Sequence, residues 1–462
     1  MDNNILWSLR LGFSSKEAQA ISDLGLTKFL EKSFHFKPES KIPDFLEGSP
    51  KTFEDFKQIR MQYKEDNTEV RKQLRIAEAK VSQEMKAWWI DKMRTEEFPL
   101  REKMTCFWHN HFVSTFQKVK VNYYIYQHHQ ILEENAFGNF KELTKKILKS
   151  NAMVRYLDNT DNKKGKNNEN LSRELLELFT LGIGNYTEDD IKNGAKALAG
   201  LAIGEDGAQY RRNLEDNSSK TYFGKTGNLK CDDLVDIIFE QKEIPYLITR
   251  KILGWFIYDT PKEELVTYYG DYFRKMKFEI KPLLTKIFSE EYVKNNAGSK
   301  IKNPLEYTVQ LMSELHIDNS NSKSVAFFIK EQGMDLFNQP NVKGWVGGNS
   351  WLTSQVYLQR NNMADLLCSG RGLNRRSLNP KDEMTAKTNK KNAVEIDWSN
   401  SGTNKQIIAE LKDRLLCEVD AASQKDFENI IKYDFNPKAE NANQVVLRLF
   451  NAMVKMPEYQ LI

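Results

Sequence analysis

The sequence predicts an all-α protein: one large multi-helical domain with a small β-hairpin inserted near residues 205–225. Apolar residues recur at helical spacing through most of the 462 residues, and prolines or polar caps stand where the expected helices begin. Short strand-like runs gather in 203–229, which is rich in Gly, Asn and Asp. We expect the hairpin that they form to cap the functional site that is predicted around residues 167–179. The chain divides into a helical core unit at 1–368, a polar connector or long loop at 369–405, and C-terminal helices at 406–462 that pack back on the core.

Composition and charge narrow the class of protein. Hydrophobic residues make up 40% of the chain and charged residues 29%, which is typical of a soluble globular protein with a substantial core. The net charge of +4 gives no sign of a nucleic-acid partner. Four widely spaced cysteines lack a zinc-binding spacing and fit reduced thiols. Since neither a signal peptide nor a membrane span is apparent, we expect the chain as written to be cytoplasmic.

The N-terminal part is expected to be helical. Helices are predicted within 5–60, with a Pro-containing loop at 38–50, and a long charged helical region follows at 52–94. Pro99 suits the first turn of the next helix, which extends to Phe112. The mixed charges of the long region indicate a solvated face.

The stretch 167–179 organises the expected site. It begins as a polar loop and becomes a helix, with Asn170 as the expected N-cap. At about 100° per residue, Leu171, Leu175 and Leu178 form one apolar stripe. This stripe predicts that the helix packs against the core.

Two carboxylates flank this stripe. Glu174 falls beside it, and Glu177 lines up next to it at helical spacing. A carboxylate at the edge of a buried face is costly unless it is paired, hydrogen-bonded or bound to a cation. Two interpretations follow: structural pairs with an arginine such as Arg173 or Arg101, or a functional site.

Two histidines near the end of the helix that follows Pro99 are candidate metal ligands. His109 and His111 are two residues apart, so on a regular helix they do not face each other. They can ligate one metal only if the helix ends near Asn110. The alternative is a pair of packed, hydrogen-bonded histidines. We expect His128 and His129 to be structural.

Caps and prolines place the elements that follow. Thr187 caps a helix, with Asp190 in the capping-box position. About four helices are expected in 231–318, and Pro304 stands in a first turn there. Glu306 follows closely, where an acid complements the helix dipole.

A second polar loop is predicted at 338–351. Trp345 and Trp351 fall within seven positions and are interleaved with glycines. Their rings are suited to form an aromatic platform for a sugar or another planar group. The alternative is that they pin the loop onto the core.

Several catalytic motifs are missing from the sequence. It has no Walker loop, no Gly-x-Gly-x-x-Gly after a strand, no Gly-x-Ser-x-Gly and no His-Glu-x-x-His. This argues against nucleotide-binding, dinucleotide-binding and serine-hydrolase classes. Chemistry outside these motifs stays open.

Short motifs spread along the chain carry a family resemblance. They are Trp88-Trp89 with Met93; Arg101-Glu102-Lys103-Met104 with Phe107-Trp108-His109-Asn110-His111-Phe112; Gly138-Asn139-Phe140; Tyr156-Leu157-Asp158-Asn159; Asn168-Glu169-Asn170; Arg173-Glu174-Leu175; Glu177-Leu178-Phe179-Thr180-Leu181-Gly182; Tyr186-Thr187-Glu188 with Asp190; Lys302, Pro304 and Glu306; Lys343-Gly344-Trp345 with Gly347-Gly348 and Trp351; and Pro457-Glu458-Tyr459-Gln460. Together they resemble the bacterial family catalogued as domain of unknown function 1800 (DUF1800). The resemblance covers nearly the whole chain, so one family unit fits better than independent domains.

The resemblance implies a predominantly helical protein without an agreed activity. Many members carry export signals, whereas none is expected here, and genes of the family often neighbour a second family that resembles sulfatases, which implies a sulfatase-like partner. One departure concerns the family's His-Asp before a Lys-Thr-x-x-Gly, where this chain has Glu215-Asp216 before Lys220-Thr221. If that histidine is a ligand in relatives, either Glu215 substitutes for it or the site is degenerate here.

The first functional hypothesis is a divalent-metal-dependent hydrolase acting on a polar, carbohydrate-related or anionic substrate. The expected metal ligands are His109, His111, Glu174 and Glu169. Glu177 is expected to act either as a second ligand or as general base on a metal-bound water, and Arg173 to hold an anionic substrate group. The expected substrate-binding residues are Asn168, Asn170, Lys343, Trp345 and Trp351.

The second hypothesis is a non-catalytic helical scaffold that binds a partner. In it the same residues form a buried network of ion pairs and hydrogen bonds that fixes the orientation of the helices. The two hypotheses differ in whether acidic and imidazole groups from separate helices meet in a hollow that water can reach.

Overall fold

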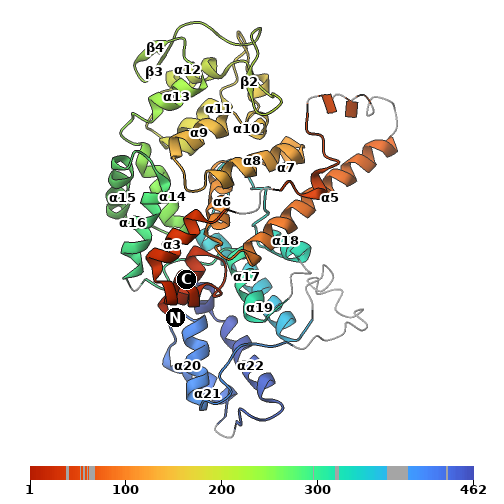
Figure 1. The fold of residues 1–462 in the computed structure, drawn as a ribbon, viewed down its shortest axis with the longest axis vertical. Helices are drawn as coiled ribbons and strands as arrows, with labels where there is room; N and C mark the ends of the chain where they lie inside the picture. Colours follow the sequence, from red (N-terminus) through yellow and green to blue (C-terminus); the bar gives the residue numbers. More distant parts are fainter. Residues whose placement is uncertain are drawn as a thin grey trace.

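The computed structural model describes residues 1–37, 41–52, 54–55, 58–59, 61, 68–294, 296–317, 322–371, 394–432 and 435–462. Within these residues the protein has 21 α-helices and two small antiparallel sheets of two strands each (Figure 1). The mostly helical fold class with a small β-hairpin insertion is thereby confirmed.

The helix α6 (Leu100–His111) lies at the centre of the first half of the chain. Eleven of its twelve residues are buried, so its charged and imidazole side chains need partners inside the protein. The other elements of this half are α1 (Asn3–Leu11), α2 (Ala18–Leu24), α3 (Leu26–His35), the short 3-10 helix η1 (Asp44–Leu46), α5 (Thr68–Thr95), α7 (Phe116–Val119), α8 (Asn122–Glu134), α9 (Phe140–Leu148), α10 (Asn151–Tyr156) and η2 (Asn159–Asp161).

The predicted helix of 167–179 has an unusual second half. It starts as α11 (Asn170–Glu174) and continues as the π-helix η3 (Leu175–Thr180). Asn170 is its first helical residue, and the N-cap is Glu169. The predicted cap is therefore displaced by one residue, and the Asn168 side-chain oxygen accepts the Asn170 N–H at 3.0 Å.

The helix starts predicted from capping residues and prolines are confirmed in the elements that follow. Thr187 and Asp190 form the predicted capping box of α12 (Glu188–Leu198). Pro304 and Glu306 stand in the first turn of α17 (Pro304–Glu314), as predicted, with Asn303 as the cap. The other elements of this region are α13 (Cys231–Ile238), α14 (Ile244–Phe256), α15 (Glu263–Lys275), α16 (Ile280–Tyr292), α18 (Ser322–Glu331) and η5 (Gly348–Trp351).

The inserted strands form two pairs and not one. β1 (Leu201–Ala202) pairs with β2 (Gln209–Tyr210), and β3 (Lys220–Tyr222) pairs with β4 (Lys225–Gly227). The two predicted strand runs therefore each pair with a nearer segment, because a short loop closes at lower entropic cost. They lie with α12 and α13 at one end of the molecule (Figure 1).

Three C-terminal helices, α20 (Asn404–Leu415), α21 (Ala421–Ile430) and α22 (Ala442–Val454), lie at the opposite end (Figure 1). The remaining elements are α19 (Ser354–Cys368) and the 3-10 helix η7 (Pro457–Gln460), and the C-terminus lies back near the N-terminus. Most of the predicted connector at 369–405 lies outside the described residues, so the three-part division stays a prediction. None of the helices in the described ranges is long and apolar enough to cross a membrane.

Candidate metal centre

The predicted residues at the start of the central helix make surface contacts. The Arg173 guanidinium lies 3.1 Å from a Glu169 oxygen and 3.0 Å from a Glu188 oxygen. All three side chains are at least one-third exposed, so these ion pairs add little stability. Asn168 is half-buried and Asn170 is exposed.

Glu174 and Glu177 are half-buried and close enough to influence each other. Burial and the neighbouring Glu177 raise the pKa of Glu174, and Lys343 and Arg173 oppose them. A Glu177 oxygen accepts a hydrogen bond from the Tyr186 hydroxyl at 3.0 Å. The structure therefore gathers four predicted residues, Glu174, Glu177, Arg173 and Lys343, into one polar patch.

The two predicted histidine ligands have separate partners. α6 continues through His111, so the break near Asn110 that a shared metal requires does not occur. His111 Nε2 donates to the Phe179 carbonyl at 3.1 Å, and its Nδ1 accepts from Lys251 Nζ at 3.1 Å. His109 Nε2 instead lies 3.1 Å from His129 Nδ1.

The two tryptophans of the loop at 338–351 are buried. Trp345 is 4% exposed and Trp351 5%, which agrees with the alternative in which they hold the loop on the core. The backbone N–H of Trp345 donates to the Asn110 side-chain oxygen at 2.6 Å. Gly344 has a φ of +84°, and a Cβ there would lie 2.2 Å from the Asn110 side-chain oxygen, so only glycine fits.

A different group of side chains does bring carboxylates and an imidazole together. Glu102 from α6, and His129 and Glu133 from α8, each offer one ligand atom, and these atoms all lie within 4.8 Å of one another. Lys92 from α5 and Glu96, which follows the end of α5, complete what we call the carboxylate–imidazole cluster. Helices α5, α6 and α8 and the residue after α5 thus supply its members.

The Lys92 ammonium lies in the middle of this cluster. Its Nζ is 2.8 Å from Glu102 Oε1 and 3.6 Å from Glu96 Oε1, and it also forms an ion pair with Glu133. The Lys92 ammonium therefore pairs with three carboxyl groups, and the buried Arg101 guanidinium is near enough to act on the same three.

His129 has one ring nitrogen without a hydrogen bond. Its side chain is fully buried, and Nε2 has no hydrogen-bond partner within the described ranges; it lies 3.9 Å from Glu133 Oε1. Burial lowers the pKa of His129 to about 3. The imidazole is therefore neutral, and when Nδ1–H donates to His109, Nε2 carries a free lone pair.

The carboxyl groups differ in their affinity for protons. Burial, with the Glu102 carboxylate nearby, raises the pKa of Glu96 to about 8 and that of Glu133 to about 8. Burial acts in the same direction on Glu102, but the Lys92 ammonium lowers its pKa below the usual value. Glu102 is thus the ionised partner of Lys92, and its other oxygen accepts the Trp89 indole N–H at 2.6 Å.

A hollow opens beside the cluster. It has a volume of about 560 Å³ and is lined by η1 and α5 residues that include Phe45, Trp88 and Asp91. Lys92 and Glu96 also line it, so they belong both to the cluster and to the hollow. The hollow therefore reaches the cluster at Lys92 and Glu96, and Glu102, His129 and Glu133 are not among the residues that line it.

Sequence reasoning missed most of this cluster. His128 is structural as expected, since it contacts Ser150 Oγ at 3.1 Å and the Phe112 carbonyl at 2.9 Å. His129 received the same interpretation, although His129 and Glu133 are spaced i, i+4 on one helix, where two side chains meet. That spacing was the available signal.

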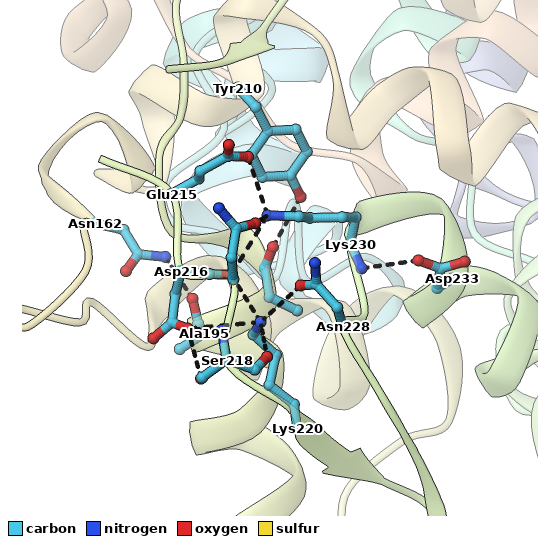
Figure 2. A network of polar contacts seen from close by, with 12 residues as sticks. Asn162, Ala195, Tyr210, Glu215, Asp216, Ser218, Lys220, Asn228, Lys230 and Asp233 are labelled. Atoms are coloured by element: carbon cyan, nitrogen blue, oxygen red, sulfur yellow. Dashed lines mark hydrogen bonds and ion pairs between the residues drawn. The ribbon is translucent and has the colours of Figure 1, made fainter. Parts of the chain in front are cut away.

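The departure at Glu215 forms part of a closed polar network (Figure 2). Lys230 Nζ lies 3.0 Å from Glu215 Oε2. The buried Lys220 ammonium donates to the carbonyls of Asp216 at 2.7 Å and Ser218 at 2.8 Å. The Glu215 carboxylate is therefore paired with a lysine that helps to shape the insertion.

Fold and site together define a helical protein with a buried carboxylate–imidazole cluster beside a hollow. The profile of the family described as "Protein of unknown function (DUF1800)" matches residues 4–461. The chain belongs to this family, and the match covers almost all of it. Comparisons with curated proteins and with solved structures give no match.

Proposed function

We propose that the protein is a divalent-metal-dependent hydrolase whose cation is held by Glu102, His129 and Glu133. The observation that carries the proposal is the buried, unpartnered His129 Nε2 within 4.8 Å of oxygens from both carboxylates. One imidazole nitrogen with two carboxylate oxygens is a donor set for ions such as Zn²⁺ or Mn²⁺. When bound, such an ion acts as a Lewis acid on water or on a substrate oxygen.

Neighbouring side chains hold these donors in place. His109 contacts the second ring nitrogen of His129 at 3.1 Å, and the Trp89 N–H fixes one oxygen of Glu102 at 2.6 Å. Such outer contacts orient metal ligands and set the tautomer of a ligating histidine. In this proposal His109 is a positioning residue rather than a ligand.

The hollow supports a small polar substrate. Its volume of about 560 Å³ falls in the range of about 300–1,000 Å³ that is usual for ligand sites. Trp88 and Phe45 give it an apolar wall, and Asp91 and Lys92 add polar groups. An aromatic ring beside charged groups suits a carbohydrate-like molecule.

Lys92 makes the proposal testable, because its ammonium lies where the cation would bind. Metal content would be measured by mass spectrometry after dialysis of the purified protein against Zn²⁺ or Mn²⁺. We expect about one metal per chain in the wild type, loss in Glu133→Gln, and tighter binding in Lys92→Met, because the competing charge is gone. Glu174→Gln is the matched control and keeps the metal.

Two outcomes would contradict this assignment. One is metal that remains in Glu133→Gln but disappears in Glu174→Gln, which would return the ligand role to the Glu174 and Glu177 patch. The other is no metal in either the wild type or Lys92→Met. A panel of nitrophenyl esters and glycosides would then test hydrolysis with and without the ion.

A second candidate function is the non-catalytic scaffold. The observation that favours it is that Lys92 already compensates the cluster, as in a second network in which Glu306 lies 2.9 Å from both Lys103 and Lys300. Both arrangements fix helices through buried charges. For a scaffold, Lys92→Met lowers the melting temperature, and divalent ions do not restore it. The scaffold would then be tested for binding to the sulfatase-like protein as its candidate partner.

A further inference from the structure

A cavity of about 220 Å³ lies between α5 and α18, apart from the hollow. α5 contributes Lys86, and α18 contributes Lys323 and Lys330. Among the residues that line it, Asp335 is the one carboxylate. Two of these ammonium groups are ion-paired, Lys86 with Asp335 and Lys323 with Glu84, so among the described residues Lys330 carries the uncompensated positive charge of the cavity.

Lys86 forms the floor of this cavity, which we call the lysine cavity. Its side chain is 11% exposed and forms an ion pair with Asp335. Burial lowers the pKa of Lys86, Asp335 opposes this change, and the nearby Lys330 reinforces it. Asp335 therefore pairs with Lys86, and the Lys330 ammonium remains close enough to repel the Lys86 ammonium.

The rim carries donors that are available to a ligand. Lys323 and Lys330 are seven residues apart on α18 and so share one face. Lys323 lies 2.5 Å from Glu84 and is more than half exposed. Lys330 is exposed, and within the described ranges it has no carboxylate at ion-pair distance. The Ser324 hydroxyl adds a neutral donor.

We propose that the lysine cavity binds a tetrahedral oxyanion, either free phosphate or sulfate or the phosphoryl or sulfuryl group of a small ester. The volume supports a ligand of this size, because it equals the share of about seven water molecules in the liquid. Ammonium groups and hydroxyls are the donors that such oxyanions accept from. Lys330 supplies the uncompensated positive charge, and the ion-paired Lys86 and Lys323 supply further N–H donors.

This binding site is separate from the proposed metal centre. The ion pair of Glu84 and Lys323 stands between them, since Glu84 lines the hollow and Lys323 lines the lysine cavity. The residues of the carboxylate–imidazole cluster do not line the cavity. The two proposals can therefore fail independently.

The experiment measures binding to the intact protein at constant ionic strength. Inorganic phosphate, inorganic sulfate and glycerol 3-phosphate would be titrated by calorimetry, with chloride as the reference anion, and the melting temperature would be followed in parallel. We expect saturable binding of at least one oxyanion and a rise in melting temperature that chloride does not give. Tighter binding of glycerol 3-phosphate than of phosphate would identify an ester as the ligand.

Two substitutions locate the binding. Lys330→Gln removes an ammonium without breaking an ion pair, and we expect it to raise the Kd at least about threefold. Lys28→Gln removes an exposed lysine on α3 and should leave the Kd unchanged. Equal effects of phosphate and chloride would overturn the proposal, because they would mean a nonspecific salt effect. Equal binding of the oxyanion by both variants would also overturn it, because Lys330 would then take no part in binding.

Discussion

Glu17 shows how the neighbours of one buried acid set its protonation. The Ser8 hydroxyl lies 2.7 Å from the Ser14 carbonyl and 3.0 Å from Glu17 Oε2. It has one proton, and the carbonyl can only accept, so both contacts are satisfied when Glu17 is protonated and donates to Ser8. Burial raises the pKa of Glu17 to about 7, which agrees with a neutral acid.

This arrangement predicts a dependence of stability on pH. The folded-state pKa of about 7 lies above the ordinary value of about 4.3. The stabilising contribution of Glu17 is therefore complete below the unfolded value and is lost as the pH rises through the folded value. Glu17→Gln stays neutral, so its stability relative to the wild type should increase by about 2–3 kcal/mol between pH 5 and pH 8.

Urea unfolding of the wild type and of Glu17→Gln at the two pH values measures this difference. Glu47→Gln on an exposed residue controls for the loss of one negative charge. A constant difference between Glu17→Gln and the wild type would mean that Glu17 is ionised in the folded protein throughout.

At the scale of residues, the sequence predicted which side of a helix a side chain faces better than it predicted what that side chain contacts. His109 and His111 were expected on different sides of their helix, and their rings do have different partners. Those partners are His129, 20 positions away, and Phe179, 68 positions away. Such contacts depend on how helices pack, which helical spacing within one element does not contain.

At the scale of elements, the π-helix η3 shapes the environment of His111. The N–H groups of Leu181 and Gly182 both donate to the Leu176 carbonyl at 3.0 Å, and the carbonyls of Leu178 and Phe179 receive side chains from other helices. Lys251 donates to Leu178 at 3.0 Å, and His111 donates to Phe179 at 3.1 Å. These contacts satisfy the carbonyls that a helix end leaves free.

His111→Phe tests this interpretation of His111 as a helix cap. Phenylalanine keeps an aromatic ring but leaves the Phe179 carbonyl without its donor and Lys251 with the Leu178 carbonyl as its remaining acceptor. We expect the free energy of unfolding in urea to fall by about 1–3 kcal/mol, with the metal content unchanged.

His35→Phe is the matched control for this substitution. His35 is exposed at the end of α3, so the change should stay within about 0.5 kcal/mol. Loss of bound metal in His111→Phe would contradict a purely structural role for His111.

The elements themselves were predictable where local chemistry decides them. The capping box of α12 was predicted from a short sequence pattern, and so were the first-turn places of Pro304 and Glu306 in α17. The π-helix and the pairing of the strands were not predictable in this way, because both depend on hydrogen-bond register. A single sequence gives register only where a buried face or a turn type specifies it.

At the scale of the whole molecule, the C-terminal segment is joined to the core by backbone pairing. Lys300 and Ile462 exchange two hydrogen bonds at 3.0 and 2.8 Å. The buried Arg360 guanidinium donates to the Gln460 side chain at 3.0 Å and to the Lys302 carbonyl at 3.0 Å. The end of the chain therefore completes the surroundings of a buried charge.

The predicted family and the predicted all-α class are both confirmed for the whole molecule, because both rest on patterns that run along the entire chain. The boundaries of the three predicted parts did not become testable, since residues 372–393 lie outside the described ranges. The contacts of Arg360 and Lys300 nevertheless tie residues on either side of that segment together.

These contacts predict that the C-terminal helices and the core unfold as one unit. Gln460→Leu removes an acceptor from a buried guanidinium, so we expect a loss of about 2–3 kcal/mol in the free energy of unfolding. In hydrogen exchange followed by mass spectrometry, peptides of α17 and of α20–α22 should lose protection together, whereas Gln19→Leu on an exposed residue should change little. If only residues 404–462 lost protection in Gln460→Leu, the C-terminal helices would be an independent unit, because their opening would not require the core to unfold.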